Sequence, residues 1–322
     1  MFEDIPVVTI EEHFWDSELD AYMQGPAAAI APHVWTRLLD FEDMRLREMD
    51  AFGIDKQVLS LTAPSLQNVP VEEAADLARR SNDKLAAIVA RHPSRFDAFA
   101  ALPTPDPEAA VAELERTVCE MGFKGCMVAG LTHGIFIDDP RYRPLLAACE
   151  RLRAPLYIHP GWPQDAVVRT WFGDYADKYP LTVRGVWGFT LETATQALRL
   201  ALSGALDEHP SLNVILGHMG EALPFLLWRV NNTCRHEKKE GRSLRELFTS
   251  QFHVTTSGFF STAALECVIA EMGIDKVMFS IDYPYASVEQ AMSWARDLPL
   301  DEINRRKILS GNAAALLGLE LG

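Results

Sequence analysis

The sequence lacks the features of membrane, secreted and nucleic-acid-binding proteins. No apolar run approaches the length of a bilayer-spanning helix, and no positively charged start precedes an apolar segment. We therefore expect a soluble protein without a signal peptide. The formal net charge of −15 disfavours a phosphate-backbone partner. The five cysteines are odd in number and show no CxxC spacing, which fits reduced thiols in a cytoplasmic protein.

Several catalytic signatures are also missing. The chain has no glycine-rich phosphate loop, no G-x-G-x-x-G after a strand and no G-x-S-x-G nucleophile elbow. These absences argue against a P-loop nucleotide-binding protein, a dinucleotide-binding enzyme and a serine hydrolase of the α/β type. No internal repeat, low-complexity tract or Pro/Gly/Ser linker divides the 322 residues. We therefore predict one domain over residues 1–322.

Strand-like and helix-like segments alternate along the whole chain. This alternation is typical of a parallel sheet with crossover helices, and eight strands predict a single (β/α)8 barrel of the α/β class with a C-terminal helix. The predicted strands are 6–13, 57–62, 96–102, 125–129, 155–159, 213–218, 252–257 and 277–282. The predicted helices are 42–52, 71–92, 107–122, 141–152, 190–208, 220–235, 261–272, 287–297 and 301–317.

Two connections are longer than a barrel requires: residues 14–41 after the first strand and residues 160–189 after the fifth. Long loops in compact domains are usually functional or disordered, and aromatic content argues against disorder. We expect lids over a flat, apolar substrate, although packing against a neighbouring subunit is an alternative for Trp171 and Phe172. The aromatic residues of the second connection are Trp162, Trp171, Phe172, Tyr175, Tyr179, Trp187 and Phe189.

Four polar residues close apolar runs that we interpret as buried strands. Glu11 and His13 end the first run, and because they are two residues apart in a strand they share one face. His159 and Asp282 end two other runs, so in a parallel barrel all four side chains gather at its carboxyl face. Two imidazoles and two carboxylates predict one bound divalent metal. The alternative, polar strand ends in solvent, does not explain why the pattern recurs.

His218 ends the sixth predicted strand, and Glu221 follows three residues later at the start of a helix. A carboxylate there could fix the tautomer of the imidazole, or Glu221 could be an ordinary charge at a helix N-terminus. Arg229, two turns further along, is placed to reach a substrate carboxylate or a subunit interface, and the sequence does not choose. His253 opens a strand at the end opposite to the expected chemistry.

Together these residues resemble the amidohydrolase-related decarboxylases, in the phenolic-acid branch that includes the γ-resorcylate (2,6-dihydroxybenzoate) decarboxylases. The resemblance covers nearly the whole chain and keeps its motifs in order. The matching motifs are Glu11-Glu12-His13-Phe14, Leu59-Ser60-Leu61-Thr62-Ala63-Pro64, Tyr157-Ile158-His159-Pro160, Trp187-Gly188-Phe189-Thr190-Leu191-Glu192-Thr193, Leu216-Gly217-His218-Met219-Gly220-Glu221, Thr255-Thr256-Ser257-Gly258 and Ser280-Ile281-Asp282-Tyr283-Pro284.

The resemblance implies a distorted (β/α)8 barrel with one divalent ion, for which we expect Mn²⁺, with Zn²⁺ or Mg²⁺ as alternatives. By the same resemblance, the residues that match metal ligands are Glu11, His13, His159 and Asp282. His218 and Glu221 match the catalytic pair, while Phe189 and Arg229 match positions near the substrate, where we also place Trp187. Gly161-Trp162 replaces the more usual polar pair of the resorcylate enzymes, which leaves the ring substitution pattern of the substrate open.

The implied reaction is the non-oxidative decarboxylation of an ortho-hydroxy aromatic acid. Asp282 would deliver a proton to the ring carbon that bears the carboxylate, with His218 and Glu221 supporting proton transfer, and loss of CO2 would restore aromaticity. One rival is a metal-dependent hydrolase of an amide, lactone or ring-opened product. A second is a catalytically silent binding protein. Barrels of this kind often form homodimers or homotetramers, and we expect one of these.

Overall fold

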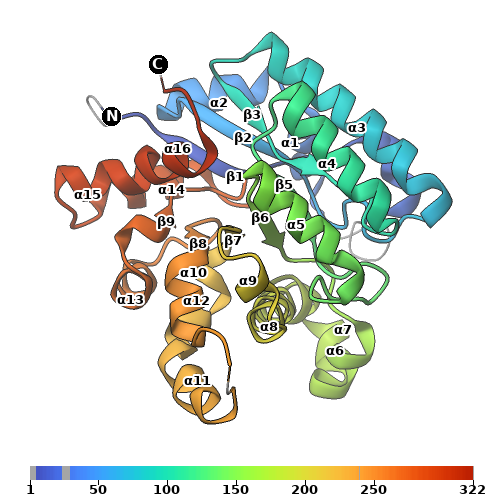
Figure 1. The fold of residues 1–322 in the computed structure, drawn as a ribbon. Coiled ribbons are helices and arrows are strands. Elements are labelled where there is room, and N and C mark those ends of the chain that lie inside the picture. Colours follow the sequence, from blue (N-terminus) through green and yellow to red (C-terminus); the bar gives the residue numbers. More distant parts are fainter. Residues whose placement is uncertain (1–4, 24–29, 239, 322) are drawn as a thin grey trace.

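The computed structural model describes residues 5–23, 30–238 and 240–321, and its strands are all parallel (Figure 1). They form two sheets, in the orders β1-β2-β3 and β4-β5-β6-β7-β8-β9. Every predicted strand is represented, which confirms the α/β class. The strands are β1 (Val8–Phe14), β2 (Lys56–Leu61), β3 (Phe96–Ala98), β4 (Ala100–Ala101), β5 (Cys126–Ala129), β6 (Leu156–His159), β7 (Val214–Leu216), β8 (Phe252–Thr255) and β9 (Val277–Met278).

The two sheets join into one ring. Only Phe99 separates β3 from β4, and its amide donates to Leu59 of β2 at 2.9 Å, while the amide of Ala100 donates to Gly125, next to β5. At the other end, Glu12 of β1 forms a parallel bridge with Tyr283, five residues beyond β9. The ring is therefore the predicted barrel, with its last contact made by an irregular segment.

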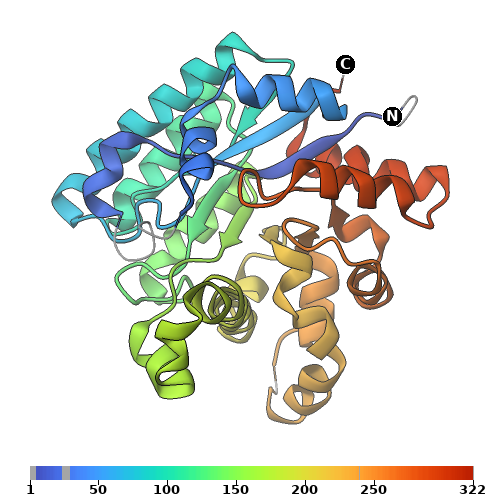
Figure 2. The same ribbon diagram turned by 180° about the vertical axis from the view of Figure 1, so that it is seen from behind.

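Helices cover the outside of this ring, and α16 covers one of its ends (Figures 1 and 2). Strand side chains such as Ile10, Tyr157 and Met278 fill the interior, where Ala313 and Leu317 of α16 pack against them. The principal helices are α2 (Met44–Phe52), α3 (Val71–Arg91), α4 (Pro107–Met121), α5 (Arg143–Leu152), α8 (Phe189–Leu202), α11 (Leu223–Glu237), α13 (Thr262–Met272), α14 (Val288–Asp297), α15 (Glu302–Arg306) and α16 (Asn312–Leu317).

Several predicted boundaries are wrong. Strands 213–218 and 277–282 end early, because the chain turns before His218 and Asp282, and helix 190–208 breaks at Gly204, whose φ is 82°. Helix 301–317 is interrupted by a π-helical turn, η6 (Lys307–Gly311). The sequence reading also missed α12 (Leu244–Gln251), although Ser243 and Glu246 form a capping box that marks its start.

The two long connections contain helices rather than open loops. The first holds η1 (Ser17–Tyr22) and α1 (Pro32–Leu39); residues 24–29 lie outside the described residues. The second holds α6 (Asp165–Phe172), α7 (Tyr175–Lys178) and the π-helical η4 (Leu181–Gly188), which runs directly into α8. Both views show α6, α7 and α11 projecting at the lower end of the molecule (Figures 1 and 2).

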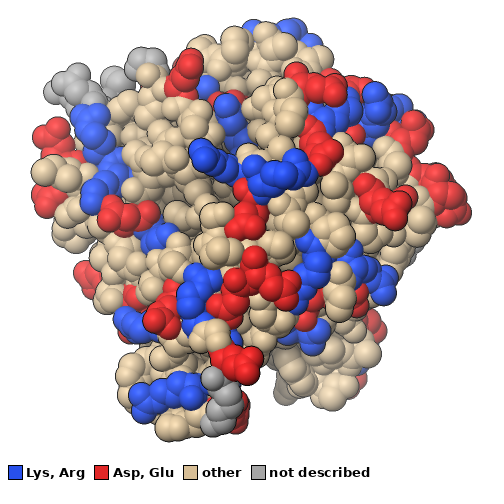
Figure 3. All heavy atoms as spheres, viewed as in Figure 1, with Lys and Arg blue, Asp and Glu red and all other residues tan. Residues whose placement is uncertain are grey.

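The surface mixes charges of both signs on the face shown in Figure 3. Exposed ion pairs such as Arg80–Glu18 and Arg169–Asp177 hold some of these charges in place. Among the described residues, no helix combines the length and the apolar character that crossing a membrane requires.

The buried His253 should make the fold sensitive to acid. Burial, with a contribution from the nearby Lys276 ammonium, lowers the pKa of His253 to about 3, and its Nε2 contacts Asn213 Oδ1 at 3.1 Å. The unfolded chain takes up this proton near pH 6.5, so acidification below that value favours unfolding by about 1.4 kcal/mol per pH unit. We expect His253→Gln to reduce the stability lost between pH 7.5 and 5 by about 2 kcal/mol.

Urea unfolding at the two pH values measures this difference. His33→Gln, at an exposed position, is the matched control and should leave the pH dependence unchanged. A His253→Gln protein with the wild-type pH dependence would contradict the prediction.

Candidate metal centre

Glu11, His13, His159 and Asp282 come together at the carboxyl edge of the ring. Each offers one ligand atom, and these four atoms all lie within 4.8 Å of one another. His159 Nε2 is 3.3 Å from Glu11 Oε1, and His13 Nε2 is 3.3 Å from Asp282 Oδ1. β1 and β6 carry the first three residues, and Asp282 lies in the segment that closes the ring.

A β-bulge in β1 aims Glu11 and His13 into the ring. Thr9 pairs with Gln57, whereas Glu12 pairs with Leu59, so β1 holds one extra residue between these pairs. Strict alternation would place Ile10 and Glu11 on opposite faces, yet Ile10 belongs to the interior cluster and Glu11 also faces inward. The bulge shifts the inward–outward alternation of side chains along β1 by one residue. The apolar interior layer that contains Ile10 is therefore followed directly by the polar layer that contains Glu11.

The donor atoms of this cluster suit a cation. Glu11 Oε1 and His13 Nε2 are buried without a hydrogen-bond partner among the described residues. His159 Nδ1 lies 2.7 Å from the carbonyl oxygen of Pro160, which can only accept, so this nitrogen carries the proton and Nε2 keeps its lone pair. Leaving such groups buried and unpaired is costly, and a divalent ion would satisfy them together.

His218 and Glu221 lie beside the cluster. His218 Nδ1 is 2.8 Å from Glu221 Oε1, so of the two alternatives for Glu221 the carboxylate–imidazole pair is the one observed. On the other side of the imidazole ring, His218 Nε2 is 3.7 Å from Asp282 Oδ2. Burial alone would lower the pKa of His218, but the carboxylates of Glu221 and Glu11 outweigh it and hold that pKa well above its ordinary value. Burial would raise the pKa of Asp282, but contacts with His13 and His218 keep it low.

The backbone at these residues is strained. Asp282 has φ of 73°, and His218, Met219, Glu221 and Ala222 have φ between 48° and 62°, in the left-handed region that non-glycine residues rarely adopt. Such outliers persist only where surrounding contacts enforce them, and they concentrate at functional sites. The sequence reading placed a strand end and a helix start here, where the structure has a tight turn.

Glu12 and Arg45 brace the cluster from outside the ring. Glu12 accepts the backbone amides of Ile281 at 3.0 Å and Tyr283 at 3.2 Å, on either side of Asp282. Arg45 is also fully buried; its guanidinium stacks 4.4 Å from the Tyr283 ring centre and donates to the His13 carbonyl. Burial raises the pKa of Glu12 to about 8, although the amides and Arg45 oppose it. Sequence reasoning missed both residues.

Three hydroxyl groups, also missed, contact Glu11 from inside the ring: those of Tyr157, Thr255 and Ser257. The sequence predicts in part which way these side chains point. Tyr157 lies two residues before His159 in one strand, and Thr255 and Ser257 are two residues apart, so each pair should share a face. What the sequence does not reveal is that both faces meet the same carboxylate.

The residues expected near the substrate are spread out. Phe189 packs edge-on against Trp162, with ring centres 5.8 Å apart, while Trp187 is 52% exposed and Arg229 lies on an exposed face of α11. Tyr285 is closer to the cluster, because its ring centre is 5.8 Å from that of His13 and its hydroxyl is 2.8 Å from Thr62 Oγ1. Trp162 and Tyr285 are therefore further candidates for contact with a ligand.

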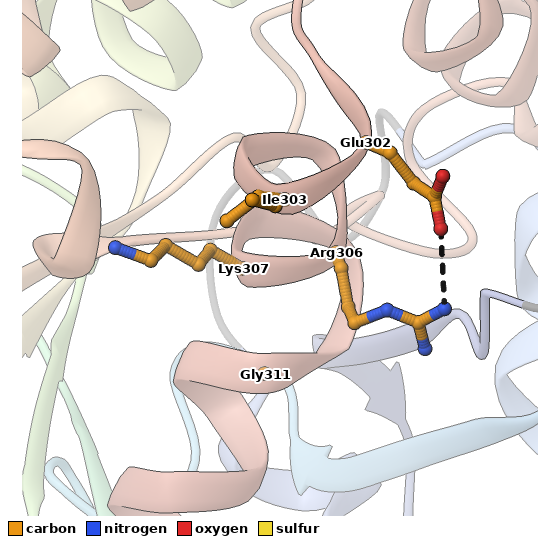
Figure 4. A pocket seen from close by; sticks show the side chains of 5 residues that line it. All are labelled: Glu302, Ile303, Arg306, Lys307 and Gly311. Atoms are coloured by element: carbon orange, nitrogen blue, oxygen red, sulfur yellow. Dashed lines mark ion pairs between the residues drawn. The ribbon is translucent and has the colours of Figure 1, made fainter.

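A surface hollow of about 250 Å³ lies apart from this chemistry, on α15 and η6 (Figure 4). Glu302, Ile303, Arg306, Lys307 and Gly311 line it. Arg306 reaches Glu302 at 3.8 Å, and Lys307 is held at 2.6 Å by Asp275. Its cations are thus already paired with acids, and it contains no member of the metal cluster.

Gly217 should be needed for the position of Glu11. A Cβ atom at Gly217 would lie 2.8 Å from Glu11 Oε2 and 3.1 Å from Oε1, although the backbone there, at φ −72°, permits alanine. We expect Gly217→Ala to displace the carboxylate and weaken Mn²⁺ binding about 10-fold or more, as measured by calorimetric titration of metal-free protein. Gly185→Ala, where a Cβ meets nothing within 4 Å, is the control. Equal affinities in the two variants would refute this prediction.

Comparison with known proteins shows likeness over nearly the whole chain. Residues 8–319 match the family model described as Amidohydrolase. γ-Resorcylate decarboxylase from Rhizobium sp. is 40% identical over 331 residues, covering 97% of this chain and 98% of the relative. A crystal structure of 2,6-dihydroxybenzoate decarboxylase in complex with 2,6-dihydroxybenzoate is 39% identical, with a TM-score of 0.89 and coverage of 98% and 100%.

A dihydroxybenzoic acid decarboxylase from Polaromonas sp. JS666 was solved with bound manganese and the inhibitor 2-nitroresorcinol. It is 37% identical to this chain and superposes with a TM-score of 0.90, covering 98% of this chain and 97% of its own. Family match, identity and fold agree with the barrel described above. The chain belongs to the amidohydrolase family.

Proposed function

We propose that this protein is a metal-dependent carboxy-lyase that removes CO2 from an aromatic acid bearing a hydroxyl group ortho to the carboxylate. The observation that carries the proposal is the convergence of Glu11, His13, His159 and Asp282 beside the His218–Glu221 pair. Relatives that match along almost the whole chain act on hydroxybenzoates, which supports the substrate class.

Glu11, His13, His159 and Asp282 would hold one divalent ion, for which we propose Mn²⁺ because a similar decarboxylase structure contains it. A mixed set of imidazole and carboxylate ligands suits Mn²⁺ and Zn²⁺ alike. When bound, the ion supplies positive charge that orients the carboxylate and the ortho oxygen of the substrate and stabilises negative charge on them.

The protein groups hold and move the proton. The carboxylates of Glu221 and Glu11 raise the pKa of His218, its Nε2 lies 3.7 Å from Asp282 Oδ2, and Glu221 contacts the opposite ring nitrogen. We propose that the proton reaches the carboxylate-bearing ring carbon through Asp282, and that CO2 leaves as aromaticity returns. Asp282 is also a proposed ligand, and both the ion and the contacts with His13 and His218 favour its ionised form, so it would carry the proton only transiently.

Aromatic side chains would frame the flat ring of the substrate. Trp162 and Phe189 pack together after β6, and Tyr285 stands beside His13. We propose these three as ring contacts. Arg229 on α11 and Trp187 on η4 are exposed in a single copy of the chain. They would contact a bound substrate if their own helices reached it, or if a second subunit presented them to it.

The ortho hydroxyl should decide which acids react. We expect 2,6-dihydroxybenzoate or a related 2-hydroxybenzoate to release one CO2 per phenol formed, and 3,5-dihydroxybenzoate, which lacks an ortho hydroxyl, to be inert. Chromatography of products together with CO2 measurement, on protein loaded with Mn²⁺, checks this. Turnover of amides or lactones without CO2 would instead establish the rival hydrolase.

Asp282→Asn should reduce decarboxylation about 10²–10⁴-fold, because the amide cannot relay the proton. Circular dichroism should show a retained fold, and assays at saturating Mn²⁺ should separate the loss of chemistry from a loss of metal. Asp275→Asn, at an exposed ion pair with Lys307, is the matched control. Full activity in Asp282→Asn would remove this residue from the proposed chemistry.

We further propose that the protein assembles into a homodimer or homotetramer through α11. Phe225 and Trp228 are 79% and 67% exposed one turn apart, and a contiguous apolar face of this kind usually marks an interface. We expect Phe225→Ser with Trp228→Ser to lower the mass measured by light scattering, and Ile303→Ser, at a similarly exposed site on α15, to leave it unchanged. A monomeric wild-type protein would refute the proposal.

A further inference from the structure

We propose that the hydroxyl groups of Tyr157, Thr255 and Ser257 form a cradle that fixes Glu11 as a ligand through one oxygen only, Oε1. The inference rests on the proposed metal binding and adds three positioning residues to it. It concerns how the chain shapes its own ligand before any ion arrives.

All three hydroxyls converge on the same atom. Thr255 Oγ1 donates to Glu11 Oε2 at 2.9 Å, and Tyr157 Oη and Ser257 Oγ donate to the same oxygen. The hydroxyls also touch one another, with Tyr157 Oη 3.0 Å from Thr255 Oγ1 and Thr255 Oγ1 2.7 Å from Ser257 Oγ. The four side chains come from β1, β6 and the end of β8, so the cradle spans the interior of the ring.

The second oxygen of Glu11 is left without such donors. Oε1 is buried and has no hydrogen-bond partner among the described residues, while His159 Nε2 lies 3.3 Å away and His218 Nε2 3.6 Å away. Burying a carboxylate is costly unless charge-assisted hydrogen bonds compensate it. Because those bonds all fall on Oε2, this oxygen is occupied, and Oε1 is the one free to meet a cation.

Ser257 also links this network to the backbone of His218. Ser257 Oγ accepts the backbone N–H of His218 at 3.1 Å, so its own proton is free to turn toward Glu11. The strained turn that carries His218 is thereby tied to the carboxylate through a single hydroxyl. Gly217 also adjoins this carboxylate, because a Cβ there would collide with it.

A carboxylate confined in this way cannot rotate to offer both oxygens. Its orientation is set before the ion binds, so less conformational entropy is lost on binding. Outer-shell partners of this kind typically contribute about 10–100-fold to metal affinity. The cradle should therefore raise Mn²⁺ affinity, an effect visible without any turnover.

Thr255 provides the sharpest test, because valine keeps its shape without the hydroxyl while serine keeps the hydroxyl without the methyl. We expect calorimetric titration of metal-free protein with MnCl2 to show about 10–100-fold weaker binding for Thr255→Val and nearly wild-type binding for Thr255→Ser. Thr117→Val, at a buried threonine that bonds only to backbone carbonyls, is the control and should bind Mn²⁺ normally.

Tyr157→Phe against Tyr142→Phe repeats the comparison with a second donor, since Tyr142 is equally buried and its hydroxyl bonds to the Thr104 carbonyl and to Thr132 instead of Glu11. Urea unfolding of each metal-free variant separates stability from affinity. If Thr255→Val and Tyr157→Phe lose stability but bind Mn²⁺ like wild type, or if Thr255→Ser binds more weakly than Thr255→Val, the cradle is refuted. Wild-type protein that binds no Mn²⁺ would instead overturn the proposed function together with the cradle.

Discussion

Burial of charge at the mouth of a closed ring is the constraint on which this structure depends. Glu11 is fully buried, the Asp282 side chain is 15% exposed, and the imidazoles of His13 and His159 lie beside them. Such groups are costly inside a protein unless every lone pair and proton finds a partner. The hydroxyls around Glu11, the amides that bind Glu12 and the carbonyl that orients His159 all supply partners. Among the residues that the structure describes, Glu11 Oε1 and His13 Nε2 are left without a hydrogen-bond partner, and both belong to the group that could hold a cation.

The irregular parts of the fold serve this arrangement. The bulge in β1 turns Glu11 and His13 inward, and it leaves Glu12 to bind the amides on both sides of Asp282. Arg45 then joins Glu12, Tyr283 and the His13 carbonyl into one buried group. The left-handed turns at His218 and Asp282 bring these residues within reach of each other, where a continued strand or helix would have aimed them apart.

The relatives in the amidohydrolase family support the type of reaction, decarboxylation, more firmly than they support one particular substrate. The cluster and the His218–Glu221 pair fit decarboxylation of a hydroxybenzoate, as in the relatives. In the segment after His159, Gly161 packs against Gly130 so closely that neither tolerates a Cβ, and Trp162 packs against Phe189.

The sequence by itself determined the order of the strands, the class of the fold and the four residues of the cluster, because apolar runs that end in polar side chains are local patterns. Only the tertiary structure decided how they meet. A one-residue bulge reverses the phase of β1, and Tyr157, Thr255 and Ser257 reach Glu11 across 146 to 246 positions of chain. Such contacts depend on register and ring closure, which local periodicity does not encode.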